Sequence, residues 1–201
     1  MSRWLTVRAW VRVHATTPAL AVLLTVALAG VVFSRTTVYT LSVIRLVTPI
    51  SVLLLLPAMA GIGVALAADN RARSPLPDPP RAAVARAEWL LVWMVLGGLA
   101  LNVGQITGTK ADAAPILRNL LLEASLAVAV VRFGYAHLAW LPPLVYTLGC
   151  MMFGYPDDQP RYYSWAVIMQ ERATTAQWVV CGGLFLVVFL LYVLGPRRFR
   201  R

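Results

Sequence analysis

Four polar side chains interrupt the apolar stretches of this 201-residue chain. Asn119 and Glu123 lie in the run Arg118-Asn-Leu-Leu-Leu-Glu, and Asn102 and Gln105 lie near the end of the preceding apolar stretch. Ionisable groups in such stretches are costly and usually face a protein interior or water. We therefore expect these four residues to line one polar cavity that opens outward. The alternative is that they form hydrogen bonds between packed helices.

Patterns of catalytic and metal sites are absent from the sequence. There is no Gly-x-x-x-x-Gly-Lys-Ser/Thr run, no His-Glu-x-x-His and no Gly-x-Ser-x-Gly. His14 and His137 are the only histidines, and Cys150 and Cys181, the only cysteines, form no Cys-x-x-Cys pair. No two carboxylates are placed for acid–base catalysis. We expect no enzymatic activity, no metal site and no cofactor.

The composition is that of a membrane protein. Hydrophobic residues make up 60% of the chain and charged residues 13%, whereas about 25% of the residues in soluble domains are charged. The apolar residues form long blocks rather than the pattern of one soluble core. The net charge of +10 comes from basic residues beside these blocks, where they set topology and contact lipid headgroups. We therefore expect a lipid bilayer as partner and no nucleic acid.

The apolar blocks predict an all-α, polytopic membrane protein with one transmembrane domain over residues 1–201. Each block has roughly the 20 residues that a helix needs to cross the bilayer core. Strands are not expected, because the blocks lack clean alternation and are rich in Ala and Leu. The six predicted spans cover residues 18–34, 46–68, 89–105, 116–131, 136–153 and 178–194.

The arginines predict the orientation of the spans. With the N-terminus inside, 12 of the 18 basic residues lie on the cytoplasmic side, and this bias favours cytoplasmic N- and C-termini. Only Lys110 among these 18 is a lysine, which suggests a GC-rich bacterial genome. We therefore expect the chain in a bacterial plasma membrane.

Residues 2–15, before the first span, have the spacing of an amphipathic helix. Trp4, Val7, Val11 and His14 recur every three or four residues, and two arginines share another face. Such a helix lies in the membrane interface, with Trp at the acyl boundary and Arg at the headgroups. The alternative is a frayed basic tail.

The longest predicted cytoplasmic connection covers residues 69–88. Four prolines within six residues interrupt any helix there, and residues 81–88 then form a short helix that leads into the third span. This loop is suited to contact a soluble partner through its arginines. The alternative is a solvated connector whose charges only fix topology. The arginines concerned are Arg71, Arg73, Arg81 and Arg86.

The longest predicted outer segment covers residues 154–177. A turn-rich stretch is followed by Tyr162, Trp165 and Met169 at helical spacing. These side chains predict a short amphipathic helix on the outer membrane face. An ordinary aromatic belt beside a loop would occupy the same position.

The order of these parts resembles the transmembrane subunit of type-2 (ABCG-like) ATP-binding-cassette exporters. The resemblance covers the whole chain and rests on topology. It implies that residues 2–15 are the elbow helix, that the loop over residues 69–88 contacts the ATPase, and that residues 162–169 form the outer helix. It further implies a separate P-loop ATPase subunit, a second permease subunit of the same or a different chain, and transport by alternating access.

A structural or anchoring subunit of a membrane complex, without a transport path, is the alternative function. The four polar residues distinguish the two hypotheses. In a permease, Asn102, Gln105, Asn119 and Glu123 face a shared cavity. In a scaffold, they pair at helix contacts or meet lipid headgroups.

Overall fold

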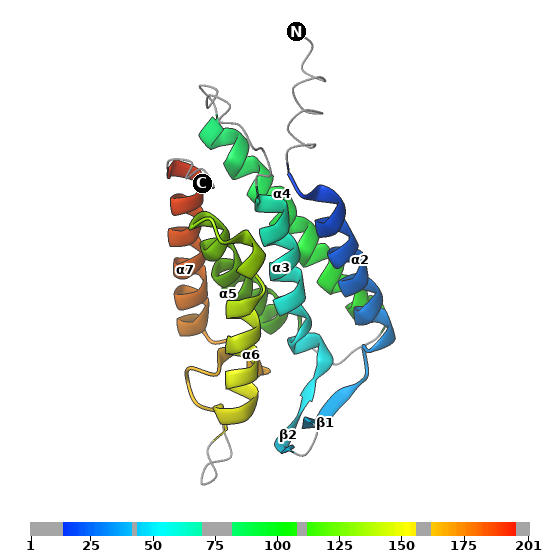
Figure 1. Ribbon diagram of the computed structural model, residues 1–201. Helices are drawn as coiled ribbons and strands as arrows, with labels where there is room; N and C mark the ends of the chain where they lie inside the picture. Colours follow the sequence, from blue (N-terminus) through cyan, green and yellow to red (C-terminus); the bar gives the residue numbers. More distant parts are fainter. Residues whose placement is uncertain (1–13, 42–43, 70–81, 108–111, 156–161, 196–201) are drawn as a thin grey trace.

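The computed structural model describes residues 14–41, 44–69, 82–107, 112–155 and 162–195. The protein is all-α, as predicted, with its long helices side by side in one bundle (Figure 1). The bounds of its elements are α2 Thr16–Val32, β1 Thr37–Leu41, β2 Ile44–Ser51, η1 Val52–Leu54, α3 Leu56–Ala68, α4 Ala82–Val103, η2 Gly104–Thr107, α5 Ala113–Arg132, η3 Ala136–Leu138, α6 Leu141–Phe153, η4 Val167–Met169 and α7 Thr175–Leu194, where η marks a short 3-10 helix.

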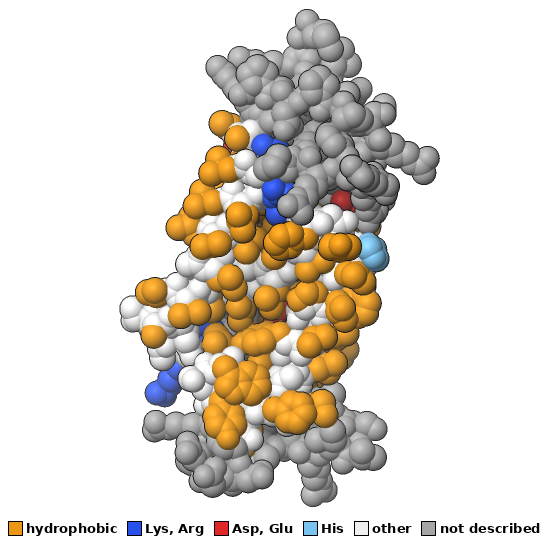
Figure 2. All heavy atoms as spheres, turned by 60° about the vertical axis from the view of Figure 1, so that its left-hand side comes forward, with side chains coloured by type: hydrophobic (Ala, Val, Ile, Leu, Met, Phe, Trp, Pro, Cys, Tyr) orange, Lys and Arg blue, Asp and Glu red, His pale blue; other side chains and the backbone are white. Residues whose placement is uncertain are grey.

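Among the described residues, four helical segments are long and apolar enough to cross a membrane: Ala83–Ile106, Ala113–Arg132, Ala136–Phe153 and Thr175–Leu194. They are compatible with a membrane-embedded protein, and in the face seen in Figure 2 hydrophobic side chains cover much of the surface. The first two predicted spans coincide with shorter apolar helices, Thr16–Val32 and Val52–Ala68. The structure therefore supports four spans, and the count of six stays a prediction.

Helix α5 lies at the centre of the bundle. Of an 18-residue apolar stretch in α5, 61% is buried within the protein. The corresponding share is 28% for residues 136–153 and 28% for α7. Helices α3 and α7 both pack on α5. Within the described part of the chain, the apolar surfaces of α6 and α7 are therefore mostly uncovered.

A glycine allows α3 to approach α5 closely. A Cβ atom built on Gly61 would lie 2.7 Å from the backbone nitrogen of Ala124 and 2.8 Å from the carbonyl carbon of Glu123. No real side chain fits at such distances, so Gly61 sets the spacing of the two helices. This close contact lies beside Glu123, which is one of the predicted site residues.

The second predicted span begins too early. Residues 46–51 belong to strand β2, which pairs antiparallel with β1 in a two-stranded hairpin, with Val38 opposite Ile50. The expectation of no strands is therefore wrong for this segment. The run Ile44–Ser51 is rich in β-branched residues, and Pro49 would interrupt a helix. Helix α3 starts only at Leu56, with Pro57 in the first turn, where a proline is tolerated.

Two connections agree with the sequence only in part. The short helix predicted over residues 81–88 is continuous with the third span, because α4 runs from Ala82 to Val103 without a break. The amphipathic helix predicted over 2–15 lies outside the described residues except at its end. There, His14 is buried and its ring lies 5.2 Å from the ring of Trp89 on α4.

Candidate functional site

A buried arginine lies in the second turn of α5. The Arg118 side chain has no exposed surface, and its guanidinium donates to three main-chain carbonyls from a distant part of the chain. Nη2 donates to the carbonyls of Val167 and Gln170 at 2.6 and 2.9 Å, and Nη1 donates to that of Arg172 at 3.2 Å. A single side chain thus ties α5 to the segment that precedes α7.

Two side-chain amides complete the surroundings of the guanidinium. Nη1 of Arg118 donates to Oε1 of Gln177 at 2.6 Å, and Nε and Nη2 donate to Oδ1 of Asn119 at 3.1 and 2.9 Å. Gln177 also forms the capping box of α7 with Thr174. All of these acceptors are neutral oxygens. Buried charges are usually paired with opposite charges, so a site made of dipoles alone is unusual.

Asn119 joins α5 to two further segments. Its Nδ2 donates to the carbonyl of Leu54 in η1 at 3.2 Å and to that of Ile168 in η4 at 3.0 Å. The Asn119 side chain is fully buried and every polar atom of its amide has a partner. Asn119 therefore pairs at contacts between elements, as the alternative interpretation of the sequence expects.

The segment held by Arg118 and Asn119 covers residues 162–174, and we call it the cap segment. It does not form the amphipathic helix predicted from Tyr162, Trp165 and Met169; only the turn Val167–Met169 is helical, as 3-10 helix η4. The carbonyls of Ile168 and Gln170 accept from α5, and that of Val167 accepts both from α5 and from the N–H of Gln170 three residues along, which is the spacing of a 3-10 turn rather than of an α-helix. Helical spacing alone does not reveal this competition.

The buried side chains of the cap segment agree with the expected pattern at Met169 but not at Trp165. Ile168 and Met169 are each 1% exposed, whereas Trp165 is 45% exposed. Tyr162 is half-buried, with its ring 5.2 Å from that of Tyr155. The aliphatic residues of η4, rather than the aromatic ones, thus enter the bundle.

Glu123 lies little more than one turn beyond Asn119 on α5, and its side chain is 1% exposed. Its Oε1 accepts a hydrogen bond from the Thr147 hydroxyl of α6 at 3.2 Å. Its Oε2 is buried and has no hydrogen-bond partner. Within the described chain, no arginine or lysine lies within ion-pair distance of it. This carboxyl group is therefore only half satisfied.

Helix α6 also contacts the cap segment. The Tyr146 hydroxyl donates to the carbonyl of Trp165 at 2.6 Å, and the next residue, Thr147, is the partner of Glu123. Successive residues of α6 thus contact the cap segment and the half-satisfied carboxyl. The sequence offered no signal for this arrangement, because the residues lie in different apolar blocks.

The other two predicted site residues, Asn102 near the end of α4 and Gln105 in η2, have separate surroundings. Nδ2 of Asn102 donates at 2.7 Å to the carbonyl of Gly98 in the same helix, and Nε2 of Gln105 is buried without a partner. In the described part of the chain, no hydrogen bond joins either residue to Asn119 or Glu123. That all four face one cavity stays a prediction.

The predicted ATPase-contact residues are described only in part. Arg71, Arg73 and Arg81 lie outside the described residues. Arg86 is half-buried in the early turns of α4, at the end of the bundle opposite the β-hairpin (Figure 1). The contact itself stays a prediction.

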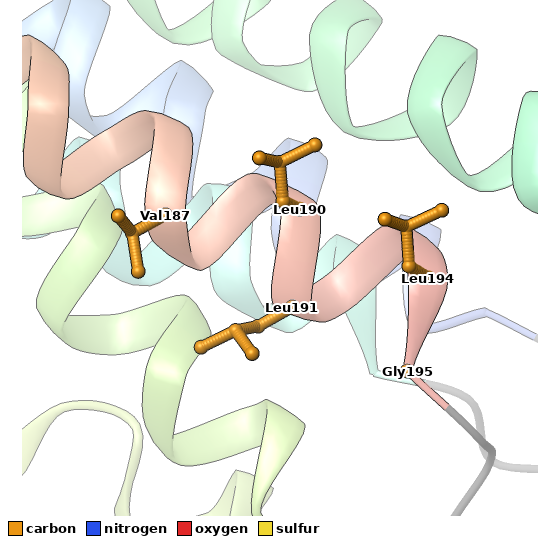
Figure 3. A pocket seen from close by; sticks show the side chains of 5 residues that line it. All are labelled: Val187, Leu190, Leu191, Leu194 and Gly195. Atoms are coloured by element: carbon orange, nitrogen blue, oxygen red, sulfur yellow. The ribbon is translucent and has the colours of Figure 1, made fainter.

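A shallow apolar groove of about 340 Å³ lies on the last turns of α7. It is lined by Val187, Leu190, Leu191, Leu194 and Gly195, whose labelled leucine and valine side chains project from the helix surface in Figure 3. The groove offers only hydrophobic contact. Across the ranges that the structure describes, no three His, Cys, Asp or Glu side chains form a metal-binding group either.

Comparison of the chain with protein-family models, curated proteins and solved structures finds no match. Functional argument therefore depends on the geometry of α5 and its neighbours.

Proposed function

We propose that the chain is the membrane-spanning permease subunit of an ATP-driven exporter, where it provides the translocation path by alternating access. The observation that carries this proposal is the half-satisfied carboxyl of Glu123 inside a predicted membrane span. A buried acceptor without a partner costs about 1–3 kcal/mol, and more when it is charged. Such a group adds nothing to a scaffold, whereas ionisable groups within spans usually mark the path of a substrate or ion.

The uncovered helix faces support an assembly of more than one subunit. Helices α6 and α7 expose most of their apolar surface, including Leu186, Val187 and Leu191 of α7 at 51–56% each. A second permease subunit, of the same or a different chain, would cover part of this surface, and lipid would cover the rest. In this proposal the translocation path forms between the subunits and near α5.

ATP hydrolysis belongs to a separate chain in this proposal, because the sequence contains no P-loop. The ATPase subunit contacts Arg71, Arg73, Arg81 and Arg86, of which Arg86 lies in the early turns of α4. The protein lies in a bacterial plasma membrane with both termini in the cytoplasm. It needs no cofactor of its own.

Co-purification tests the proposal. The tagged chain is extracted from its native membrane in mild detergent, co-purifying proteins are identified, and ATPase activity is measured. We expect a P-loop ATPase, and we expect the double change Arg81→Glu and Arg86→Glu to reduce its recovery. Arg172→Glu is the matched control, because this arginine has an exposed side chain in the cap segment. Purification without an ATPase would contradict the exporter proposal.

A structural or anchoring subunit is the second candidate, favoured by the amides of Asn119 and Asn102. Both form hydrogen bonds within the chain, as a scaffold requires. In that case the chain purifies with other integral proteins and without ATPase activity. Substitution of Glu123 by Gln would then leave the set of co-purifying proteins unchanged.

A further inference from the structure

Three residues of the cap segment, Ala166, Ile168 and Met169, are buried against the bundle, although the segment lacks the internal hydrogen bonds of an α-helix. The carbonyls of Val167, Ile168, Gln170 and Arg172 accept from α5. Buried main-chain carbonyls without donors are costly, and more so in the absence of water. The buried position of the cap segment therefore depends on donors that α5 supplies, and Arg118 supplies most of them.

The same guanidinium connects the cap segment to α7. Gln177 accepts from Arg118 and belongs to the first turn of α7, and its Nε2 donates to Oε1 of Gln170 in the cap segment. Tyr146 attaches α6 to the carbonyl of Trp165. Movement of the cap segment away from Arg118 would therefore release α6 and α7 from a shared contact.

The chemistry of the acceptors makes this contact reversible. An arginine paired with a carboxylate gains the attraction between opposite charges in addition to its hydrogen bonds. Arg118 donates only to neutral carbonyl and amide oxygens, and water can replace such acceptors one by one.

We propose that Arg118 is a latch, which holds the cap segment closed against the bundle and opens that end of the protein when its bonds to the segment break. The latch is a property of the fold and applies to either candidate function above. The plug that it retains consists of Ile168 and Met169, each 1% exposed.

Cysteine accessibility tests the latch in the full chain in permeabilised native membranes. The background carries Cys150→Ala and Cys181→Ala, so that the introduced cysteine is the only thiol that can react. Both native cysteines are buried, and alanine is small enough to replace them there. Ile168→Cys reports on the plug. Ser164→Cys, at an exposed position of the same segment, and Leu90→Cys, at a 1% exposed position on α4, are the controls. The rate of reaction with a water-soluble maleimide is measured for each.

Arg118→Lys weakens the latch, because a lysine keeps the charge but its single nitrogen cannot reproduce the fork of the guanidinium. We expect the labelling rate at Ile168→Cys to rise about tenfold or more, which corresponds to the loss of one or two charged hydrogen bonds. The rate at Leu90→Cys should stay constant. If both rates rise together, Arg118 supports the whole fold and the latch is overturned.

Gln177→Glu strengthens the contact with Arg118 more than it weakens the contact with Gln170, because it adds an ion pair with the guanidinium while it removes one neutral hydrogen bond, that from Nε2 to Oε1 of Gln170. It places a carboxylate where the amide oxygen now lies 2.6 Å from Nη1 of Arg118, and a Glu at this position keeps the capping box and suits a helix N-terminus. We expect labelling at Ile168→Cys to fall about threefold or more, as charge-assisted bonds are stronger, with Leu90→Cys unaffected. If the Arg118→Lys chain does not fold, this variant decides alone, and an unchanged rate overturns the proposal.

Discussion

Helix α5 carries two buried polar sites, at Arg118–Asn119 and at Glu123, and their side chains are satisfied to different degrees. The first site meets carbonyls of η1 and of the cap segment, and each of its polar atoms has a partner. The second site has one hydrogen bond from Thr147 and one oxygen without a partner. Burial alone therefore does not tell a structural polar group from one that is available for function.

The difference has a geometric origin. The first site faces the short 3-10 turns η1 and η4 and the extended backbone after η4, where most carbonyls are not engaged in α-helical hydrogen bonds and can accept from a side chain. Glu123 faces α6 and the close contact with α3, where the backbone groups already bond within their own helices. Only a side chain such as Thr147 can then serve as a partner.

Removal of the guanidinium should have the largest effect. Arg118→Met leaves the buried carbonyls of Val167, Gln170 and Arg172 without this donor, and each such loss costs about 1–3 kcal/mol. We expect the free energy of unfolding to fall by at least about 3 kcal/mol, measured by denaturation in detergent. The control Arg172→Met removes an exposed side chain and should change it by less than about 0.5 kcal/mol. Equal effects would show that Arg118 is not the main support of the cap segment.

Loss of the neighbouring amide comes next. Asn119→Leu removes the donor to Leu54 and Ile168 and one acceptor of Arg118, so we expect a loss of about 2–3 kcal/mol. Asn102→Leu is the control. Asn102 bonds only to a carbonyl of its own helix, and the change should cost less than about 1 kcal/mol. Thermal unfolding of both variants, followed by circular dichroism, measures the difference, and a reversed order would contradict the assigned contacts.

The close contact behind Glu123 provides the third prediction. Gly61→Ala places a Cβ atom against the backbone of α5, and overpacking of this kind costs about 1–3 kcal/mol. Gly149→Ala on α6 is the control, because a Cβ atom there has no neighbour within 4 Å. That change should be neutral or stabilise the helix by about 0.5–1 kcal/mol. Unfolding of the two variants in the same detergent tests the assigned packing, which fails if both behave alike.

The smallest effect on stability is expected at Glu123. Glu123→Gln keeps an acceptor for Thr147 and replaces the carboxyl oxygen that has no partner by an uncharged amide NH2 that has none either, so we expect a change below about 1 kcal/mol. Under the transport proposal, the same variant should still bind its ATPase subunit but lose stimulation of ATP hydrolysis on reconstitution in lipid. A loss of stability as large as that of Arg118→Met would instead make Glu123 a structural residue.

The helices at the centre and at the end of the chain could be predicted well from hydropathy. The predicted spans 116–131 and 178–194 lie within α5 Ala113–Arg132 and α7 Thr175–Leu194. The start of α7 was placed too late because its first turn is polar, with a capping box formed by Thr174 and Gln177. Hydropathy does not register a helix start that is stabilised by side-chain hydrogen bonds.

The segments between the spans were predicted less well. Residues 46–51 are apolar enough for a span but form strand β2, because β-branched residues and Pro49 favour an extended backbone. In the cap segment, helical spacing of Tyr162, Trp165 and Met169 did not produce an α-helix. In both places a local pattern competed with pairing to another segment, and the pairing prevailed.

The sequence by itself determined the all-α class, the apolar surface of the helices and the presence of a few costly polar groups within them. These properties depend on composition and on spacing along the chain, which are local. The tertiary structure alone decided which polar groups are satisfied. Arg118 finds its acceptors 49–59 residues away in the chain, apart from its neighbour Asn119, while Glu123 finds only Thr147. Hydrogen bonds require direction and short distance, and only the folded chain brings donor and acceptor to that geometry.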